Sequence, residues 1–282
     1  MANGNFTQVT EFFLTGISES LDLQIPLFFV FLVIYGLTVT GNLIIITLTS
    51  VDSRLQTPMY FFLRHLAIVN LGNSTVIAPK MLINFLVKKL TTSFYECDAQ
   101  LGGFFIFIVA EIFMLAVMAY DRYVAICNPL LYMAVVSQQV CFLLVSLTYL
   151  YGFSTAIVVS CCVFSMSYCS CNVINHFYCD TVPLIAFIHI CIYKLDVFLT
   201  VVVASYFNII LSILRIPSHM TAVSVFYGTL FFMYLQPRNN HSLDIDKMAS
   251  VFYTLVIPML NPMIYSLRNK DVKAALRKFL TN

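Results

Sequence analysis

The sequence contains no tryptophan and few charged side chains. Of its 282 residues, 10% are Asp, Glu, Lys or Arg, whereas soluble domains carry about 25%. The apolar share is 60%, against about 45–50% in soluble domains. This composition excludes a soluble globular protein, and it leaves Phe and Tyr to supply all of the aromatic surface.

Other absences narrow the class of protein further. The first 25 residues contain no Lys or Arg, so the basic n-region of a cleavable signal peptide is missing and the first apolar helix is expected to direct insertion. The net charge of +2 does not indicate a nucleic-acid partner. We find no Gly-rich phosphate loop and no internal repeat. The nine cysteines favour a secretory-pathway compartment over the reducing cytosol.

Long apolar runs are abundant. Seven of them are long enough, or nearly so, to cross a bilayer as helices. They are Pro26–Ser50, Met59–Leu82, Leu101–Tyr123, Val140–Phe164, Leu195–Leu214, Met220–Leu235 and Met248–Leu267. Seven helices of about 22 residues take up about 154 residues, so no large extramembrane domain remains. The predicted fold is an all-α bundle of seven transmembrane helices.

An odd number of spans puts the two termini on opposite sides of the membrane. Residues 1–25 carry no basic side chain, whereas a group of Lys and Arg follows Leu267, which by the positive-inside rule keeps the tail in the cytoplasm. We therefore expect one domain over residues 1–282, with residues 1–25 outside, the helix bundle at 26–267 and a cytoplasmic tail at 268–282. A glycosylation sequon at Asn5 agrees with this orientation. The tail segment Asn269–Leu280 has an amphipathic pattern, and it is expected to lie on the lipid of the inner membrane surface.

Two short motifs lie near the inner ends of the third and seventh predicted spans. Asp121-Arg122-Tyr123 closes the third span. An acid and a base at this place can have a functional role, or they can simply anchor the helix at the membrane interface. In Asn261-Pro262-Met263-Ile264-Tyr265 the proline removes a helix hydrogen bond beside polar side chains. Prolines are common in membrane helices, so this motif alone also has a purely structural interpretation.

Together, the two motifs resemble the DRY and NPxxY motifs of rhodopsin-like G-protein-coupled receptors, and longer strings resemble vertebrate olfactory receptors. These strings are Gly41-Asn42, Leu55–Leu63 (LQTPMYFFL), Met118–Cys127 (MAYDRYVAIC), Phe226-Tyr227-Gly228 and Pro258–Asn269 (PMLNPMIYSLRN). The resemblance covers essentially the whole chain. It implies a plasma-membrane receptor, not an enzyme, with no cofactor or metal. Such a receptor binds a small apolar odorant and signals through a stimulatory heterotrimeric G protein of the olfactory type to adenylate cyclase.

The resemblance also implies roles for individual residues. Apolar side chains of the third, sixth and seventh spans would line the odorant pocket: Phe104, Phe105, Ile108, Val109, Ile112, Tyr227, Leu230, Phe231, Tyr234, Val251 and Thr254. The switch coupled to the G protein would comprise Asp121, Arg122, Tyr123, Asn261, Pro262 and Tyr265. The outer disulfide would join Cys97 to Cys179, with Cys169 and Cys191 as a second pair. Without the resemblance, an aromatic-rich helix is more often packing or lipid contact.

Glu111 is the one carboxylate deep in a span, where an ionisable group is costly and marks a functional candidate. The family usually has Asp in the second span at the place of Asn70, so a cation shared by two carboxylates would lose one of its charges here. We expect a hydrogen bond between a protonated Glu111 and Asn70, because neutralising a buried acid costs less than burying its charge. A cation bound at Glu111 is the alternative. Asn42 is the third polar residue expected in this membrane core.

Two stretches are shorter than in the family. After Ser218 the chain passes directly to His219, omitting roughly a dozen residues, or about three helical turns, of the inner loop and sixth helix. A comparable number is missing between Cys179 and Ser205. Two alternatives therefore stay open: a deletion variant that is retained in the endoplasmic reticulum and does not signal, and a small-molecule transporter or channel. The second alternative lacks inverted repeats and a charged pathway at mid-membrane.

Overall fold

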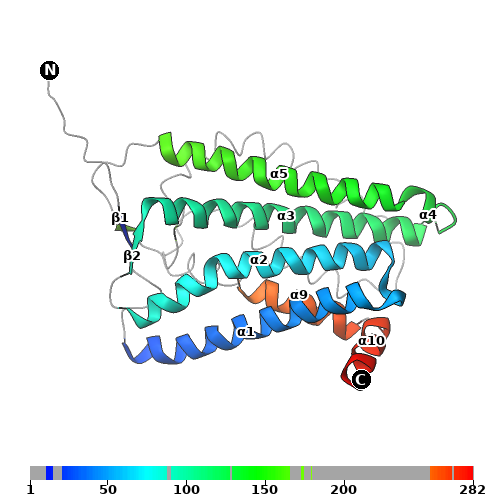
Figure 1. Ribbon diagram of the computed structural model, residues 1–282, viewed down its shortest axis with the longest axis horizontal. Coiled ribbons are helices and arrows are strands. Elements are labelled where there is room, and N and C mark those ends of the chain that lie inside the picture. Colours follow the sequence, from blue (N-terminus) through cyan, green and yellow to red (C-terminus); the bar gives the residue numbers. More distant parts are fainter. Residues whose placement is uncertain are drawn as a thin grey trace.

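The computed structural model describes residues 11–14, 21–87, 90–127, 129–165, 173–174, 179, 255–268 and 270–281. Within them, four helices are long and apolar enough to cross a membrane. These helices lie side by side (Figure 1): α1 (Leu21–Val51), α2 (Pro58–Leu86), α3 (Phe94–Cys127) and α5 (Gln138–Ser165). Helix α9 (Ile257–Arg268) packs against α1 and α2 and supplies the inner part of the seventh predicted span. The fifth and sixth predicted spans lie outside the described residues.

The observed helices are longer than the predicted spans. Helix α3, for example, begins at Phe94 instead of Leu101 and ends at Cys127 instead of Tyr123. Helix α1 likewise begins at Leu21, before the predicted bundle boundary at residue 26. Hydropathy detects only the part of a helix that suits hydrocarbon, whereas the backbone hydrogen bonds continue into polar turns such as Phe94–Gln100. The predicted boundaries therefore mark the apolar segment and not the ends of the helix.

A small sheet at one end of the bundle was not predicted. Strand β1 (Glu11–Leu14) lies between β2 (Leu90–Ser93) and β3 (Val173–Ile174), antiparallel to the first and parallel to the second. Phe12 of β1 is buried and its ring lies 6.1 Å from that of Phe94 at the start of α3. The strands are two to four residues long, too short for a period-2 pattern to reveal them. The segment before α1 is thus joined to the connection between α2 and α3 and to a strand that follows α5.

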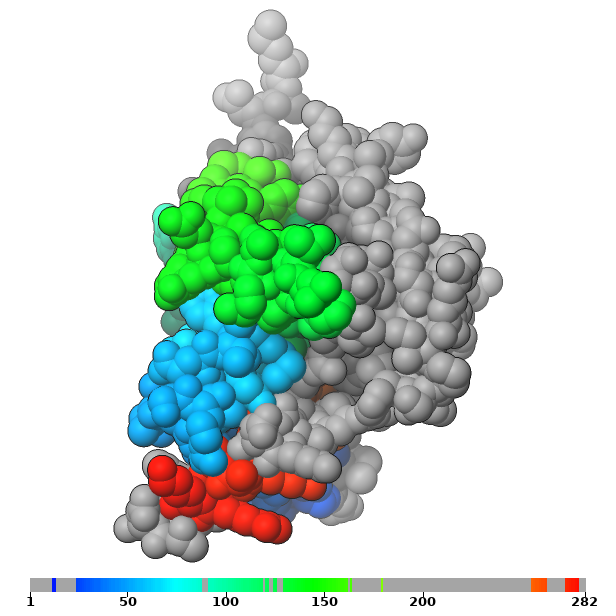
Figure 2. All heavy atoms as spheres, turned by 90° about the vertical axis from the view of Figure 1, so that its right-hand side faces the viewer, coloured from blue at the N-terminus to red at the C-terminus, as the bar shows by residue number. Residues whose placement is uncertain are grey.

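At the opposite end of the bundle lie the 3-10 helix η1 (Ser53–Leu55), α4 (Tyr132–Val135) and α10 (Lys270–Thr281). Figure 2 looks onto this end and shows α10, in red, lying across it beside η1 and the start of α2. Val272 and Ala275 of α10 are buried in the core, whereas Lys273, Arg277 and Lys278 are exposed. The predicted amphipathic tail helix is confirmed, and part of its apolar face covers the bundle.

The string LQTPMYFFL has a structural explanation at this end. Leu55 is buried at the end of η1, Pro58 begins α2, and Phe62 and Leu63 are buried in the same core cluster as Leu55. Proline suits the first turn of a helix because its missing N–H would have no partner there. Asp52 caps η1 by accepting hydrogen bonds from the side chain and backbone N–H of Arg54, which hold the pKa of its carboxyl at about 2. The turn between α1 and α2 therefore keeps its geometry across the physiological pH range.

Helices α3 and α5 approach each other closely at Gly152. A Cβ atom on Gly152 would lie 2.8 Å from the backbone carbonyl oxygen of Ile106, and a backbone atom cannot move aside as a flexible side chain can. We expect Gly152→Ala to destabilise the protein by about 1–3 kcal/mol, the usual cost of overpacking a membrane or soluble core. The measurement is the midpoint of thermal unfolding of the purified protein in detergent.

Gly36→Ala in α1 is the matched control, because a Cβ at Gly36 meets nothing within 4 Å. This variant should be as stable as the parent or slightly more so, since Ala favours helix. Equal stability of the two variants would show that α3 and α5 are farther apart than described.

Candidate functional site

Four polar side chains from three helices meet in the interior of the bundle. Glu111 of α3 is 4% exposed, and Asn70 and Asn73 of α2 and Asn261 of α9 are also buried. Asn261 Nδ2 donates to both Glu111 Oε1 and Asn70 Oδ1, each at 3.3 Å. Asn73 Nδ2 donates to Glu111 Oε2 at 3.5 Å. Because buried polar groups are stable only when hydrogen-bonded, this polar cluster ties α2, α3 and α9 together.

The prediction of a direct hydrogen bond between Glu111 and Asn70 was wrong. The structure joins these two residues through Asn261, whose amide nitrogen donates to both of them. The Asn261 side chain reaches both α2 and α3 from α9, and an amide with two donor hydrogens can satisfy two acceptors at once. Sequence reasoning assigned Asn261 to the switch at the inner end of the bundle, yet its side chain also completes the membrane core.

Asn42 compensates for the proline in α9. Pro262 has no N–H, so the carbonyl of Pro258, four residues earlier, loses its helical partner. Asn42 Nδ2 donates to this carbonyl at 3.2 Å. Gly41 gives the necessary room, because a Cβ there would lie 3.3 Å from Pro262 Cγ. The Gly41-Asn42 pair and the Asn261-Pro262 pair are therefore complementary halves of one contact between α1 and α9.

The cluster has the chemistry of a hydrogen-bond switch. Among the described residues, no group of three or more His, Cys, Asp and Glu side chains is arranged to hold a metal ion. The hydrogen-bond donors to the Glu111 carboxyl group among the described residues are the side-chain amides of Asn73 and Asn261, neither of which carries a charge. The side-chain oxygens of Asn73 and Asn261 accept no hydrogen bond from the described part of the chain. These amides can therefore exchange partners when α9 moves relative to α2 and α3.

At the inner end of α3, Asp121 is buried and bonded to α4. The Tyr132 hydroxyl donates to Asp121 Oδ1 at 2.7 Å, and Asp121 is 3% exposed. Burial, followed by the Asp121 carboxylate, raises the pKa of the Tyr132 hydroxyl, so this group stays protonated and remains a donor. Arg122, Tyr123 and Tyr265 lie on α3 and α9, and their side chains are outside what the structure describes. Sequence reasoning missed Tyr132, because α4 has only four residues and no periodicity.

The predicted pocket residues on α3 face two directions. Phe104 packs against a cluster that includes Ile77 of α2 and Leu255, whereas Phe105 packs against Val159 and Val163 of α5. The other α3 positions in the prediction are buried or partly buried: Ile108, Val109 and Ile112. The remaining predicted lining residues lie outside the described part of the chain: Tyr227, Leu230, Phe231, Tyr234, Val251 and Thr254. The pocket stays a prediction, and Phe105 contributes to helix packing.

The outer end of α3 carries a disulfide between Cys97 and Cys179, the pairing that the resemblance implied. Cys97 lies in the first turn of α3, and Cys179 is 1% exposed. The bond joins residues 82 positions apart in the sequence, so the covalent ring that it closes includes most of α3 and all of α4 and α5. Cys169, Cys191 and the sequon at Asn5 lie outside the described residues.

Comparison with known proteins identifies the family. The family model described as "Olfactory receptor" matches residues 31–282. The chain is 70% identical to human olfactory receptor 8J1 and 70% identical to human olfactory receptor 8J3, in each case over 100% of this chain and 98% of the relative. It is 51% identical to mouse olfactory receptor 8U3, over 99% of this chain and 96% of the relative. The chain belongs to the olfactory receptor family.

Family membership settles the architecture and the class of protein. The receptor is a bundle of seven transmembrane helices, of which α1, α2, α3 and α5 and the inner part of the seventh are described here. It is a membrane receptor and not an enzyme. Each of the Asp121-Arg122-Tyr123 and Asn261-Pro262 motifs also had a purely structural interpretation when taken alone. Family membership places both in a receptor of the G-protein-coupled class.

The alignment also measures how much shorter this receptor is. Its alignment with human olfactory receptor 8J1 has 308 positions while the chain has 282 residues, a difference of 26. This difference is of the size expected from two gaps of about a dozen residues each. The places of the two gaps, after Ser218 and between Cys179 and Ser205, stay predictions.

Proposed function

We propose that this receptor binds a small apolar odorant from the outer side of the membrane and signals through a stimulatory G protein of the olfactory type to adenylate cyclase. The single observation that carries the proposal is membership of the olfactory receptor family over nearly the whole chain. The apolar character of Phe104, Ile108, Val109 and Ile112 supports a hydrophobic ligand, because such a pocket offers few polar groups.

The buried polar cluster supports a mechanism for the signal. A ligand shifts a conformational equilibrium only by binding one state more tightly than the other. Phe104, a proposed pocket residue, packs in the same cluster as Leu255, two residues before α9 begins. Movement of α9 would change the contacts of Asn261 with Glu111 and Asn70. We infer that these hydrogen bonds rearrange between the inactive and active states, together with Arg122 and Tyr265 at the inner end.

We place the receptor in the plasma membrane with its N-terminus outside. Strand β1 and helix α10 lie at opposite ends of the bundle (Figure 1), which supports termini on opposite sides of the membrane. The end with α10 carries the exposed Lys273, Arg277 and Lys278, and basic residues favour the cytoplasmic side. These cations are also placed to meet anionic lipid headgroups of the inner leaflet.

The test is a cyclic AMP assay on cells that express either the receptor or a loop-extended variant. In the variant, the residues that human olfactory receptor 8J1 has at the gap are inserted after Ser218. A panel of small apolar odorants is applied to both. We expect the loop-extended variant to respond and the parent chain to give little or no cyclic AMP, because the parent has almost no basic inner loop between its fifth and sixth spans for a G protein to contact.

Surface staining of an N-terminal tag on intact cells is the control for expression. If both proteins stain and neither responds to any odorant, the proposed signalling function is wrong. A full response from the parent chain would support the function and contradict the prediction about the gap. If the parent chain stays inside the cell while the extended variant reaches the surface, the parent is the retained deletion variant.

A further inference from the structure

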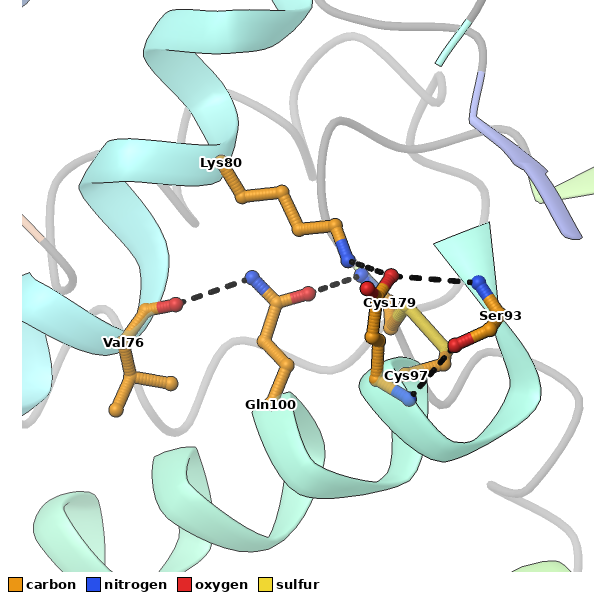
Figure 3. Close-up of polar contacts among 7 residues, drawn as sticks. Val76, Lys80, Ser93, Cys97, Gln100 and Cys179 are labelled. Atoms are coloured by element: carbon orange, nitrogen blue, oxygen red, sulfur yellow. Dashed lines mark hydrogen bonds and ion pairs between the residues drawn. A yellow bond between two sulfur atoms is a disulfide. The ribbon is translucent and has the colours of Figure 1, made fainter. Parts of the chain in front are cut away.

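Gln100 is a buried polar residue outside the polar cluster around Glu111. It lies on α3, three residues after Cys97, and is 7% exposed. Its Oε1 accepts a hydrogen bond from the backbone N–H of Cys179 at 3.3 Å, and its Nε2 donates to the backbone carbonyl of Val76 in α2 at 3.2 Å. Figure 3 shows the amide between these two partners, beside the disulfide. One side chain thus joins α3 to α2 and to the outer loop that contains Cys179.

The backbone of α2 reaches this amide because α3 has a glycine at the contact. A Cβ atom added at Gly103 would lie only 3.1 Å from Val76 Cγ2, so a larger residue at 103 would hold Val76 farther from α3. Gln100 and Gly103 are three residues apart and therefore share one face of the helix. The closeness of the two helices and the Gln100 hydrogen bond to Val76 depend on each other.

Other polar contacts near the disulfide are weaker. Lys80 and Glu96 form an ion pair at 3.5 Å, and Ser93 exchanges hydrogen bonds with Glu96. The Glu96 side chain is 65% exposed, and exposed ion pairs contribute little to stability because water screens them. Hydrogen bonds of a buried amide are not screened, and losing one leaves a buried group without a partner. Gln100 therefore contributes more than Lys80 or Glu96 to the position of Cys179 relative to α2 and α3.

We propose that Gln100 is a positioning residue that holds the backbone of Cys179 against α2 and α3 above the odorant pocket. The disulfide limits the distance between Cys97 and Cys179, but both hands of a disulfide occur in proteins, so the bond by itself does not set the direction of the Cys179 backbone N–H. The amide adds an orientation, because it binds the backbone of Cys179 on one side and that of Val76 on the other. Phe104 follows one helical turn below Gln100. The inference rests on the proposed function in that the pocket below the loop receives the odorant.

The test measures hydrogen–deuterium exchange in the peptide that contains Cys179, using the purified full-length receptor in lipid nanodiscs with its disulfide intact. Gln100→Met keeps the length of the side chain but removes both hydrogen bonds. We expect the Cys179 amide to exchange about 3- to 10-fold faster in this variant, the effect of losing one net hydrogen bond. Gln100→Glu keeps the acceptor for Cys179 and loses the donor to Val76, so its Cys179 amide should exchange more slowly than that of Gln100→Met and faster than the parent's. Glu96→Gln is the control and should exchange like the parent.

A Gln100→Met receptor whose Cys179 amide exchanges as slowly as the parent's would overturn the proposal. If Gln100→Met does not fold, the Gln100→Glu receptor decides, and a Cys179 amide that exchanges as slowly in it as in the parent would overturn the proposal. A second measurement uses the most potent odorant from the cyclic AMP panel on the loop-extended variant, where Gln100→Met should raise the half-maximal concentration and Gln100→Glu should raise it less. Absence of any active odorant would count against the proposed function alone, because the exchange result does not depend on a ligand.

Discussion

Replacement of Cys97 by serine is expected to remove most of the receptor from the cell surface. Loss of a native disulfide typically costs about 2–5 kcal/mol, and folded proteins are stable by only about 5–15 kcal/mol. Here the bond also attaches the buried Cys179 to α3, where Gln100 binds its backbone. Cys179→Ser should have the same effect. The measurements are surface staining of an N-terminal tag and the midpoint of thermal unfolding in detergent.

The double variant Cys97→Ser, Cys179→Ser separates loss of the bond from exposure of a free thiol. If the bond is what matters, the double variant should be as unstable as either single variant and no worse, because both changes remove one interaction. Cys161→Ser is the control, since Cys161 is exposed on α5 and lies outside the Cys97–Cys179 bond. Parent-like unfolding temperatures for the Cys97 and Cys179 variants would contradict the prediction.

Replacement of Glu111 is expected to discriminate sharply between glutamine and leucine. Glu111→Leu leaves the amide nitrogens of Asn73 and Asn261 without their carboxylate acceptors, and a buried donor without a partner costs about 1–3 kcal/mol. We therefore expect Glu111→Leu to unfold at a clearly lower temperature than the parent. Glu111→Gln should stay close to the parent, because the Asn73 side-chain oxygen accepts no hydrogen bond from the described residues and can turn to accept one from the new amide.

Thermal unfolding at two sodium concentrations tests whether charge matters at this site. A neutral, hydrogen-bonded Glu111 predicts the same sodium response for the parent and Glu111→Gln. If glutamine is as damaging as leucine, and sodium stabilises the parent alone, then the negative charge and a bound cation hold the cluster together. This outcome would establish the alternative stated in the sequence analysis, a cation bound at Glu111.

Much of the receptor's architecture follows from the sequence alone. The apolar runs locate the spans because hydrocarbon accepts only helices of sufficient length whose side chains are apolar. Three further features act through local rules. The Leu55–Leu63 string starts a helix at Pro58, and Pro262 removes one N–H from α9. The spacing of apolar and basic residues in 270–281 follows the helical period. For this reason the four described spans and the tail helix agree with the prediction, while their ends extend further.

The tertiary structure decided which distant residues meet. Nothing local in the sequence indicates that Asn261 lies between Glu111 and Asn70, that Asn42 binds the carbonyl released by Pro262, or that Gln100 joins Val76 to Cys179. Strand β1 likewise forms only because β2 and β3 are brought beside it. Each of these contacts depends on the rotation and depth at which the helices pack. Helix packing depends on close approaches such as those of Gly103 to Val76 and of Gly152 to Ile106. A glycine in a sequence does not reveal which residue of another helix will approach it.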